Sequence, residues 1–154
     1  MRGVMNRELR LPGLLIGLGL GGFVDGILLH QLLQWHHMIS AVRSPDTLPG
    51  LRMNTVGDGL FHVLAWLFVL SGIGLLSARV SRDRGRAWRS RTLWAWAIAG
   101  WGVFNVVESL IDHQILGVHH VREGPHRLWW DLGFLALGVV LIGAGWAWQR
   151  KPSS

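Results

Sequence analysis

Histidines and carboxylates recur in this sequence in an order and spacing that could bind a metal ion. One acidic residue, one His-Gln pair and one His-His pair follow each other twice, with a constant offset of 83 residues between the copies. The first copy is Asp25, His30-Gln31 and His36-His37; the second is Glu108, His113-Gln114 and His119-His120. Neutral imidazole and carboxylate together are common ligands of Zn²⁺ and of other transition-metal ions. The repeated motif therefore predicts a metal centre.

Two further acids extend this pattern less faithfully. The segment Asp58-Gly59-Leu60-Phe61 resembles Asp131-Leu132-Gly133-Phe134 at an offset of 73 residues. His62 follows the first segment, whereas a leucine stands at the corresponding place in the second. We therefore expect an asymmetric site, with an Asp-x-x-x-His pair on one side and only the acid on the other.

Depth along the helices ranks these residues as ligands. His30 and His37 are seven residues apart, which is about 10 Å along a helix. The histidine pairs at 36–37 and 119–120 then lie near the outer interface, where a metal entry path is as reasonable as ligation. An ideal α-helix points Asp25 about 140° away from His30. The expected ligands are His30, His62 and His113, with Asp25, Asp58, Glu108 and Asp131 as ligands or their hydrogen-bond partners, and His37 and His120 as further candidates.

Four apolar segments must position these groups. They cover about 11–33, 56–77, 93–116 and 128–148, and each has at least the 20 or so residues that span a bilayer. The sequence thus predicts an all-α, four-helix transmembrane bundle with up-down-up-down topology, as a single membrane domain over 1–154. The repeat halves, about 11–77 and 93–148, would be related by an axis along the membrane normal. The acid in the first segment and its length argue against a secretory signal.

The basic residues predict an orientation rather than a nucleic-acid partner. The net charge is +6, and the arginines crowd into the N-terminus and the loop between the second and third apolar segments. The positive-inside rule places that loop and both termini in the cytoplasm. We expect a multi-pass protein of the bacterial inner membrane whose partner is the lipid bilayer, with the polar groups in the outer leaflet. The sequence contains no cysteine, which excludes disulfides and thiolate ligands.

The two motif copies also carry a family resemblance. The stretches Gly-Phe-Val-Asp-Gly-Ile-Leu-Leu-His-Gln-Leu-Leu-Gln-Trp-His-His (22–37) and Asn-Val-Val-Glu-Ser-Leu-Ile-Asp-His-Gln-Ile-Leu-Gly-Val-His-His (105–120) resemble the bacterial membrane proteins grouped as domain of unknown function 2243. The resemblance extends over nearly the whole chain. It implies a four-helix membrane protein without an assigned activity. Some members of that family are associated with copper-handling assembly factors of haem-copper oxidases. This association implies copper or respiratory-chain biology.

Several functions remain open at this stage. The first is a metal-binding protein with Fe, Zn or Cu in a His/carboxylate centre near the outer face, acting in redox chemistry or metal delivery. The second is a haem protein with His30 and His113 as axial ligands. The third is a proton- or ion-coupled transporter, and the fourth is a structural or assembly protein without a cofactor. A homo-oligomer or a respiratory-chain partner is compatible with each of them.

Overall fold

Four long helices make up the protein. The computed structural model describes residues 2–80, 87–88 and 90–150, and these contain helices and no strand. The helices are α1 (Arg2–Val24), continued by the π-helix η1 (Asp25–Leu32); α2 (Leu48–Arg79); α4 (Arg91–Glu108), continued by the π-helix η2 (Ser109–Ile115); and α5 (Arg127–Arg150). All four are long and apolar enough to cross a membrane. The predicted all-α, four-helix membrane fold is confirmed.

Helix α2 begins earlier than its hydropathy predicted. The apolar pattern placed its start near residue 56, whereas the helix begins at Leu48. Thr47 caps it, because the Thr47 hydroxyl oxygen accepts a hydrogen bond from the Gly50 N–H at 3.2 Å. Proline at the second position suits a helix start, since its missing N–H has no partner there in any case. Hydropathy marks only the apolar part of a span, so the polar first two turns were missed.

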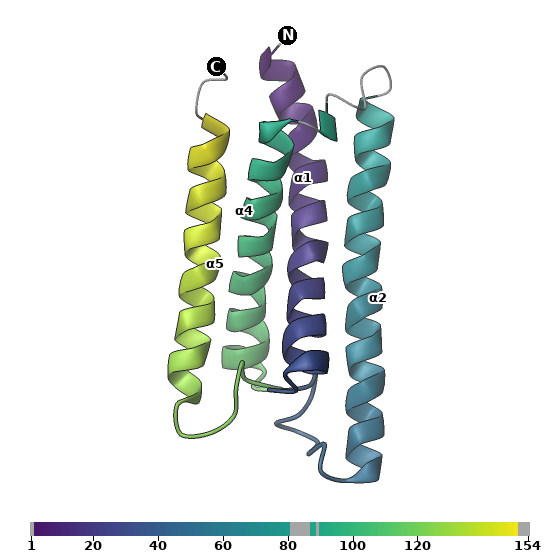
Figure 1. The fold of residues 1–154 in the computed structure, drawn as a ribbon, viewed down its shortest axis with the longest axis vertical. Helices are drawn as coiled ribbons and strands as arrows, with labels where there is room; N and C mark the ends of the chain where they lie inside the picture. The colour runs from purple at the N-terminus through teal and green to yellow at the C-terminus, as the bar shows by residue number, and fades with distance from the viewer. Residues whose placement is uncertain (1, 81–86, 89, 151–154) are drawn as a thin grey trace.

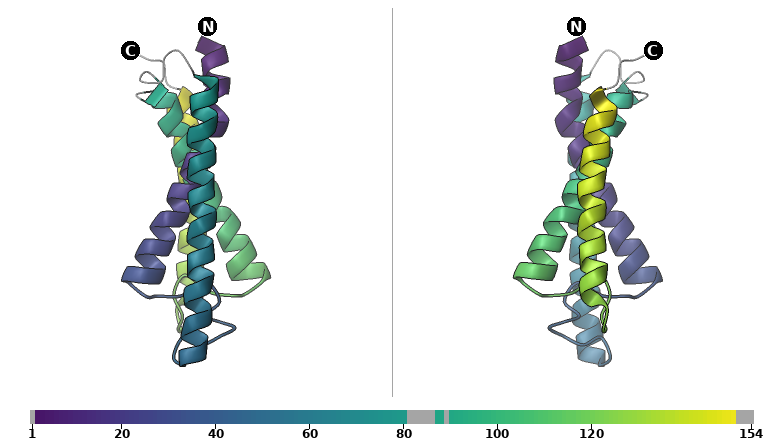
Figure 2. Two further views of the ribbon diagram at one scale, coloured as in Figure 1. Left: turned by 90° about the vertical axis from the view of Figure 1, so that its right-hand side faces the viewer. Right: turned by 90° about the vertical axis from the view of Figure 1, so that its left-hand side faces the viewer.

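The helices form a bundle with a central pair. Figure 1 shows the start of α1 and the end of α5 at one end of the bundle and the loops at 33–47 and 116–126 at the other. Helices α1 and α4 pack against each other, while α2 packs on α1 and α5 on α4. In Figure 2, α1 and α4 cross near mid-length and then diverge toward the loop end. The divergence leaves room between their last turns for side chains from the loops.

Small residues bring the two central helices together near the crossing. A Cβ atom added to Gly17 would lie 1.8 Å from the carbonyl oxygen of Ala97. Glycine at this position therefore permits backbone contact between α1 and α4, as small residues do at helix interfaces in membranes. Gly102 has the same role between α4 and α5: a Cβ atom added to it would lie 2.5 Å from the carbonyl oxygen of Gly138. The first helix thus approaches its partner most closely in this region at Gly17.

The outer helices present apolar side chains to their surroundings. In the apolar 18-residue stretch of each helix, only 17% is buried in α2 and in α5, against 50% in α1 and in α4. Exposed apolar surface on this scale is typical of helices that face lipid. The protein is therefore a membrane protein whose central pair is more deeply buried than its two flanking helices.

Candidate metal centre

The two π-helices turn the acids toward the histidines. A π-helix has its hydrogen bonds between residues five apart, so these residues share a face. Leu33 N–H donates to the Leu28 carbonyl oxygen at 2.8 Å, which extends this pattern past η1. Asp25 and His30 are five apart, and their Oδ2 and Nε2 atoms lie 3.1 Å from each other. The expectation that Asp25 points away from His30 was wrong, because it assumed an ideal α-helix.

Each π-helix ends in a left-handed turn that brings the following histidine back toward the bundle axis. Gln34 has a φ of 50° and Gly117 a φ of 57°, at equivalent places in the two motif copies. This conformation commonly ends helices. The chain then folds so that the rings of His36 and His119 stack, with centroids 4.6 Å apart and 3° between the ring planes. The stacked pair lies where the two halves of the repeat meet.

Main-chain carbonyls fix how these two rings are protonated. His36 Nδ1 lies 2.9 Å from the Val121 carbonyl oxygen, and His119 Nδ1 lies 3.1 Å from the Met38 carbonyl oxygen. A carbonyl only accepts, so each Nδ1 carries the proton and donates it. Burial lowers the pKa of His36 to about 3, and burial also lowers the pKa of His119. Both rings are therefore neutral at physiological pH, with an Nε2 lone pair available.

Asp58 orients the remaining histidines of the first half. Its Oδ1 lies 2.9 Å from His30 Nδ1 and accepts from the Met38 N–H at 2.9 Å. Its Oδ2 lies 2.7 Å from His37 Nδ1 and accepts from the Gln31 amide at 3.3 Å. Two donors on each oxygen use all the lone pairs of a carboxylate, so the histidine nitrogens donate. His30 therefore presents its Nε2 atom to the interior.

Asp131 repeats this arrangement in the second half. Its Oδ2 lies 2.7 Å from His120 Nδ1, and its Oδ1 accepts from the Val121 N–H at 3.0 Å. The His113 Nδ1 atom is more loosely held, at 3.4 Å from Oδ1. The two acids that follow the motif in sequence thus have one role: each orients histidines through their Nδ1 atoms.

Four side chains converge on one point. One ligand atom from each of His30, His36, Glu108 and His119 lies within 4.8 Å of the other three. All four side chains are buried, with at most 3% exposure. The Nε2 atoms of His36 and His119 and both Glu108 carboxylate oxygens have no hydrogen-bond partner, and the His30 Nε2 atom lies 3.1 Å from Asp25 Oδ2. Buried polar atoms without partners are rare in proteins, and a metal ion would satisfy all of these at once.

Most of the other residues that the sequence singled out lie around this four-residue group. His113 is beside it, with its ring 4.9 Å from that of His119. Asp25 contacts the group through His30. His62 faces elsewhere: its Nδ1 donates to the Asp58 carbonyl oxygen at 2.7 Å and its ring stacks on Phe23. Asp58, Asp131, His37 and His120 form the surrounding hydrogen bonds already described.

Two members of the group were ranked low from sequence. His36 and His119 lie beyond the helix ends, where periodicity does not place side chains. Their signal was the offset of 83 residues, which they share with the rest of the motif. Asn54 was not considered at all. Its amide accepts from the Ile39 N–H at 3.0 Å and donates to the Arg43 carbonyl oxygen at 2.7 Å, which holds the loop that carries His36.

A polar hollow lies at the loop end of the bundle. It has a volume of about 560 Å³, and His36 and His37 form part of its wall. Asp46 and Glu123 line it as well. The hollow therefore joins the buried histidines to carboxylates at the end of the bundle away from the termini.

Fold and site together define a class of protein: a four-helix membrane protein with a buried His/carboxylate cluster that could hold a metal ion. The family model described as a predicted membrane protein, domain of unknown function 2243, matches residues 12–152. The chain belongs to this family, which confirms the resemblance seen in the two motif copies. No curated protein and no solved structure matches the chain.

Proposed function

We propose that the protein binds a transition-metal ion through His30, His36, His119 and Glu108. The observation that carries this proposal is the convergence of three imidazole nitrogens and one carboxylate, all buried and, apart from the contact of His30 with Asp25, without other partners. Three nitrogen ligands and one oxygen ligand suit Zn²⁺, Fe or Cu and do not suit Ca²⁺ or Mg²⁺, which prefer oxygen alone. His113 and Asp25, at the edge of the group, can complete the coordination.

The hydrogen bonds around the group favour an ion that is retained. Each of the three histidine ligands has its Nδ1 atom held by a carboxylate or a main-chain carbonyl. Such partners orient ligating histidines and raise metal affinity. A tightly held Fe or Cu ion suits redox chemistry. With the termini in the cytoplasm, this chemistry would take place near the outer face of the bacterial inner membrane.

Metal delivery is a second candidate, because of the polar hollow at the loop end. Asp46 and Glu123 at its wall would attract a cation, and His36 and His37 would receive it. Carboxylates at the mouth of a cleft raise the local concentration of cations. In this role a cation would enter from the outer side through the hollow and then bind to the buried four-residue group. A respiratory-chain partner or a second copy of the chain stays a prediction from the sequence.

The geometry favours a metal ion over the remaining alternatives. The His36 and His119 rings each lie within 6.5 Å of the rings of both His30 and His113, so imidazoles occupy the space that a porphyrin would need. A transporter needs a path through the other half of the bundle. There, Gly17 brings the backbones of α1 and α4 into contact. Neither arrangement supports haem binding or transport.

Metal content of the purified full-length protein tests the proposal. We expect close to one Fe, Zn or Cu per chain by elemental analysis after extraction from membranes. The double variant His36→Ala/His119→Ala should lose it. His62→Ala is the matched control, because His62 is a histidine of the same bundle that faces away from the group. Wild-type protein without metal, or equal losses in both variants, would refute a site at these residues.

A further inference from the structure

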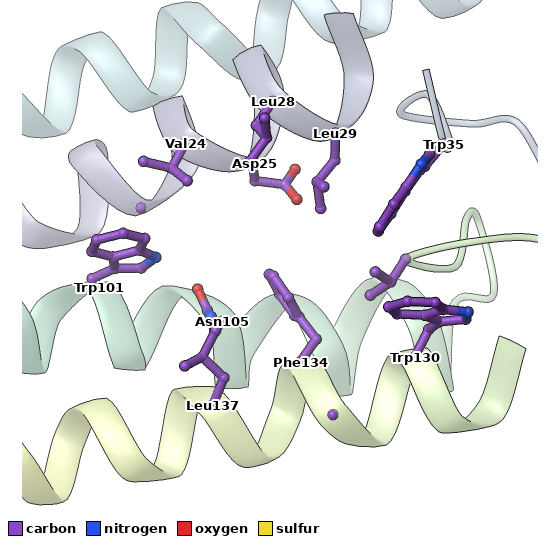
Figure 3. Close-up of a pocket in the computed structure, with 13 residues that line it drawn as sticks. Val24, Asp25, Leu28, Leu29, Trp35, Trp101, Asn105, Trp130, Phe134 and Leu137 are labelled. Atoms are coloured by element: carbon purple, nitrogen blue, oxygen red, sulfur yellow. The ribbon is translucent and has the colours of Figure 1, made fainter. Parts of the chain in front are cut away.

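An apolar cavity lies beside the metal-binding group. It has a volume of about 340 Å³ and is enclosed by η1, the end of α1, α4 and α5. Figure 3 shows that aromatic rings form much of its wall. Cavities of this size and lining are typical of sites for small organic molecules. The aromatic residues are Trp35, Trp101, Trp130 and Phe134.

Two buried polar side chains face this cavity from opposite sides. Asp25 projects into it from η1 and Asn105 from α4, as Figure 3 shows. Asn105 is fully buried, and neither its amide nitrogen nor its amide oxygen has a hydrogen-bond partner. The Asp25 Oδ2 atom lies 3.1 Å from His30 Nε2. A buried amide that stays unpaired is destabilising, so the Asn105 amide indicates a ligand that bears hydrogen-bonding oxygen atoms.

The cavity is bordered by residues of the lipid-facing surface. Val24, Leu28 and Leu137 line it and are each about 40% or more exposed. A molecule that reaches the cavity between these side chains comes from the hydrocarbon phase of the bilayer. It must therefore be lipid-soluble. A lipid acyl chain meets this condition but would leave the Asn105 amide unpaired.

We propose that this cavity binds the ring of a lipid-soluble quinone or quinol. The flat ring packs between the aromatic side chains, and the apolar tail leaves between Val24 and Leu137 into the bilayer. The Asn105 amide both donates and accepts, so it pairs with a ring carbonyl or a ring hydroxyl. The Asp25 carboxylate accepts from a quinol hydroxyl. Binding of the ring does not depend on the metal, although Asp25 also contacts His30 of the metal-binding group.

A second cavity provides an internal control. It has a volume of about 380 Å³ and lies at the equivalent place of the other half, with Glu108 in the position of Asp25. Gly22 stands there in the position of Asn105, so this cavity lacks the amide. Val107 lines it as Val24 lines the first cavity, and both valines are exposed. Blocking each cavity at its valine therefore gives matched variants on the outer surface of the bundle.

Equilibrium dialysis of the full-length protein in lipid nanodiscs against decylubiquinone tests the proposal. We expect saturable binding of one molecule per chain. Asn105→Leu and Val24→Phe should each weaken it at least tenfold, and Val107→Phe should leave it unchanged. Decylbenzene, which has the tail and a ring without oxygen atoms, should not compete.

Three results would overturn the proposal. Binding that does not saturate, or equals that of empty nanodiscs, excludes a site. Competition by decylbenzene identifies an apolar cavity that an acyl chain fills. Equal effects of Val24→Phe and Val107→Phe exclude the cavity with the amide. The unfolding midpoint of the same samples reports folding, and their metal content tests the metal proposal separately, so failure here is distinct from failure of the metal proposal.

Discussion

The stacked rings of His36 and His119 are joined across the repeat by reciprocal hydrogen bonds. Each donates its Nδ1 proton to a main-chain carbonyl that belongs to the other half, on Val121 and Met38 respectively. These two carbonyl residues are 83 positions apart, the offset of the motif. Each half of the chain therefore completes the ligand set of the other. Neither half could present its histidine correctly alone.

The first prediction compares the two acids that orient histidines. In Asp58 each carboxylate oxygen already accepts two hydrogen bonds. Asp58→Asn replaces one of these oxygens by an NH₂ group, which cannot accept from the donors that face it, so His30 loses its orientation. We expect metal affinity to fall about 10- to 100-fold, as is usual for such partners. Asp131→Asn should have a smaller effect, because it holds His113, which lies beside the four-residue group, at 3.4 Å. Zn²⁺ titration against a competing chelator measures both affinities; a larger loss for Asp131→Asn would contradict this ranking.

The sequence predicted the membrane fold and half of the four-residue group, and physical reasons explain the rest. Apolar length defines the four spans, and the repeat identifies His30 and Glu108 by residue type. The direction in which the Asp25 side chain points depends on the π-helix that begins at this residue, and no local sequence pattern predicted a π-helix. His36 received little weight because its ring is fixed by a carbonyl of a distant loop. Asn105 escaped notice because a single asparagine in an apolar helix has no motif.

The second prediction concerns acid stability of the metal-free protein. The pKa of His36 is about 3 in the folded state and about 6.5 when unfolded, so between these values only the unfolded chain binds the proton. Folding stability is therefore complete above pH 6.5 and falls as the pH drops toward 3. His119 acts in the same direction. For His36 alone the slope is at most about 1.4 kcal/mol per pH unit.

Thermal unfolding in detergent between pH 7 and 5 measures this effect. His36→Gln cannot titrate at that position, so its unfolding midpoint should fall less steeply with acid than that of the wild type. His126→Gln removes an exposed histidine and should keep the wild-type slope. A midpoint that rises with acid, or a slope unaltered by His36→Gln, would show that His36 is not held neutral by burial.

The third prediction tests the close contact of the central helices. Gly17→Ala places a methyl group 1.8 Å from the Ala97 carbonyl oxygen, so the helices must separate. Such overpacking usually costs 1–3 kcal/mol or more. Gly74→Ala is the matched control, because nothing lies within 4 Å of its added Cβ. It should be neutral or slightly stabilising, since alanine favours helix. Unfolding midpoints that are equal for the two variants would contradict the contact at Gly17.

The last prediction follows from the one acid that breaks the symmetry of the repeat. Glu108 belongs to the four-residue group, while its counterpart Asp25, which is shorter by one methylene, does not. The longer side chain therefore selects the half in which His30 is a ligand. In the double variant Asp25→Glu/Glu108→Asp the longer acid lies in the other half. The ion should then move to the equivalent position and take His113 in place of His30.

Metal content, measured after alanine substitutions in the wild type and in the Asp25→Glu/Glu108→Asp variant, shows whether His30 or His113 binds the ion. In the wild type, His30→Ala should lower metal content more than His113→Ala. In the exchanged background the order should reverse, while the shared His36 and His119 remain essential in both. If His30→Ala still lowers metal content more than His113→Ala after the exchange, the length of the acid does not decide which histidine binds the ion. The difference would then come from the orienting acids, because Asp58 accepts from four donors and Asp131 contacts His113 more loosely.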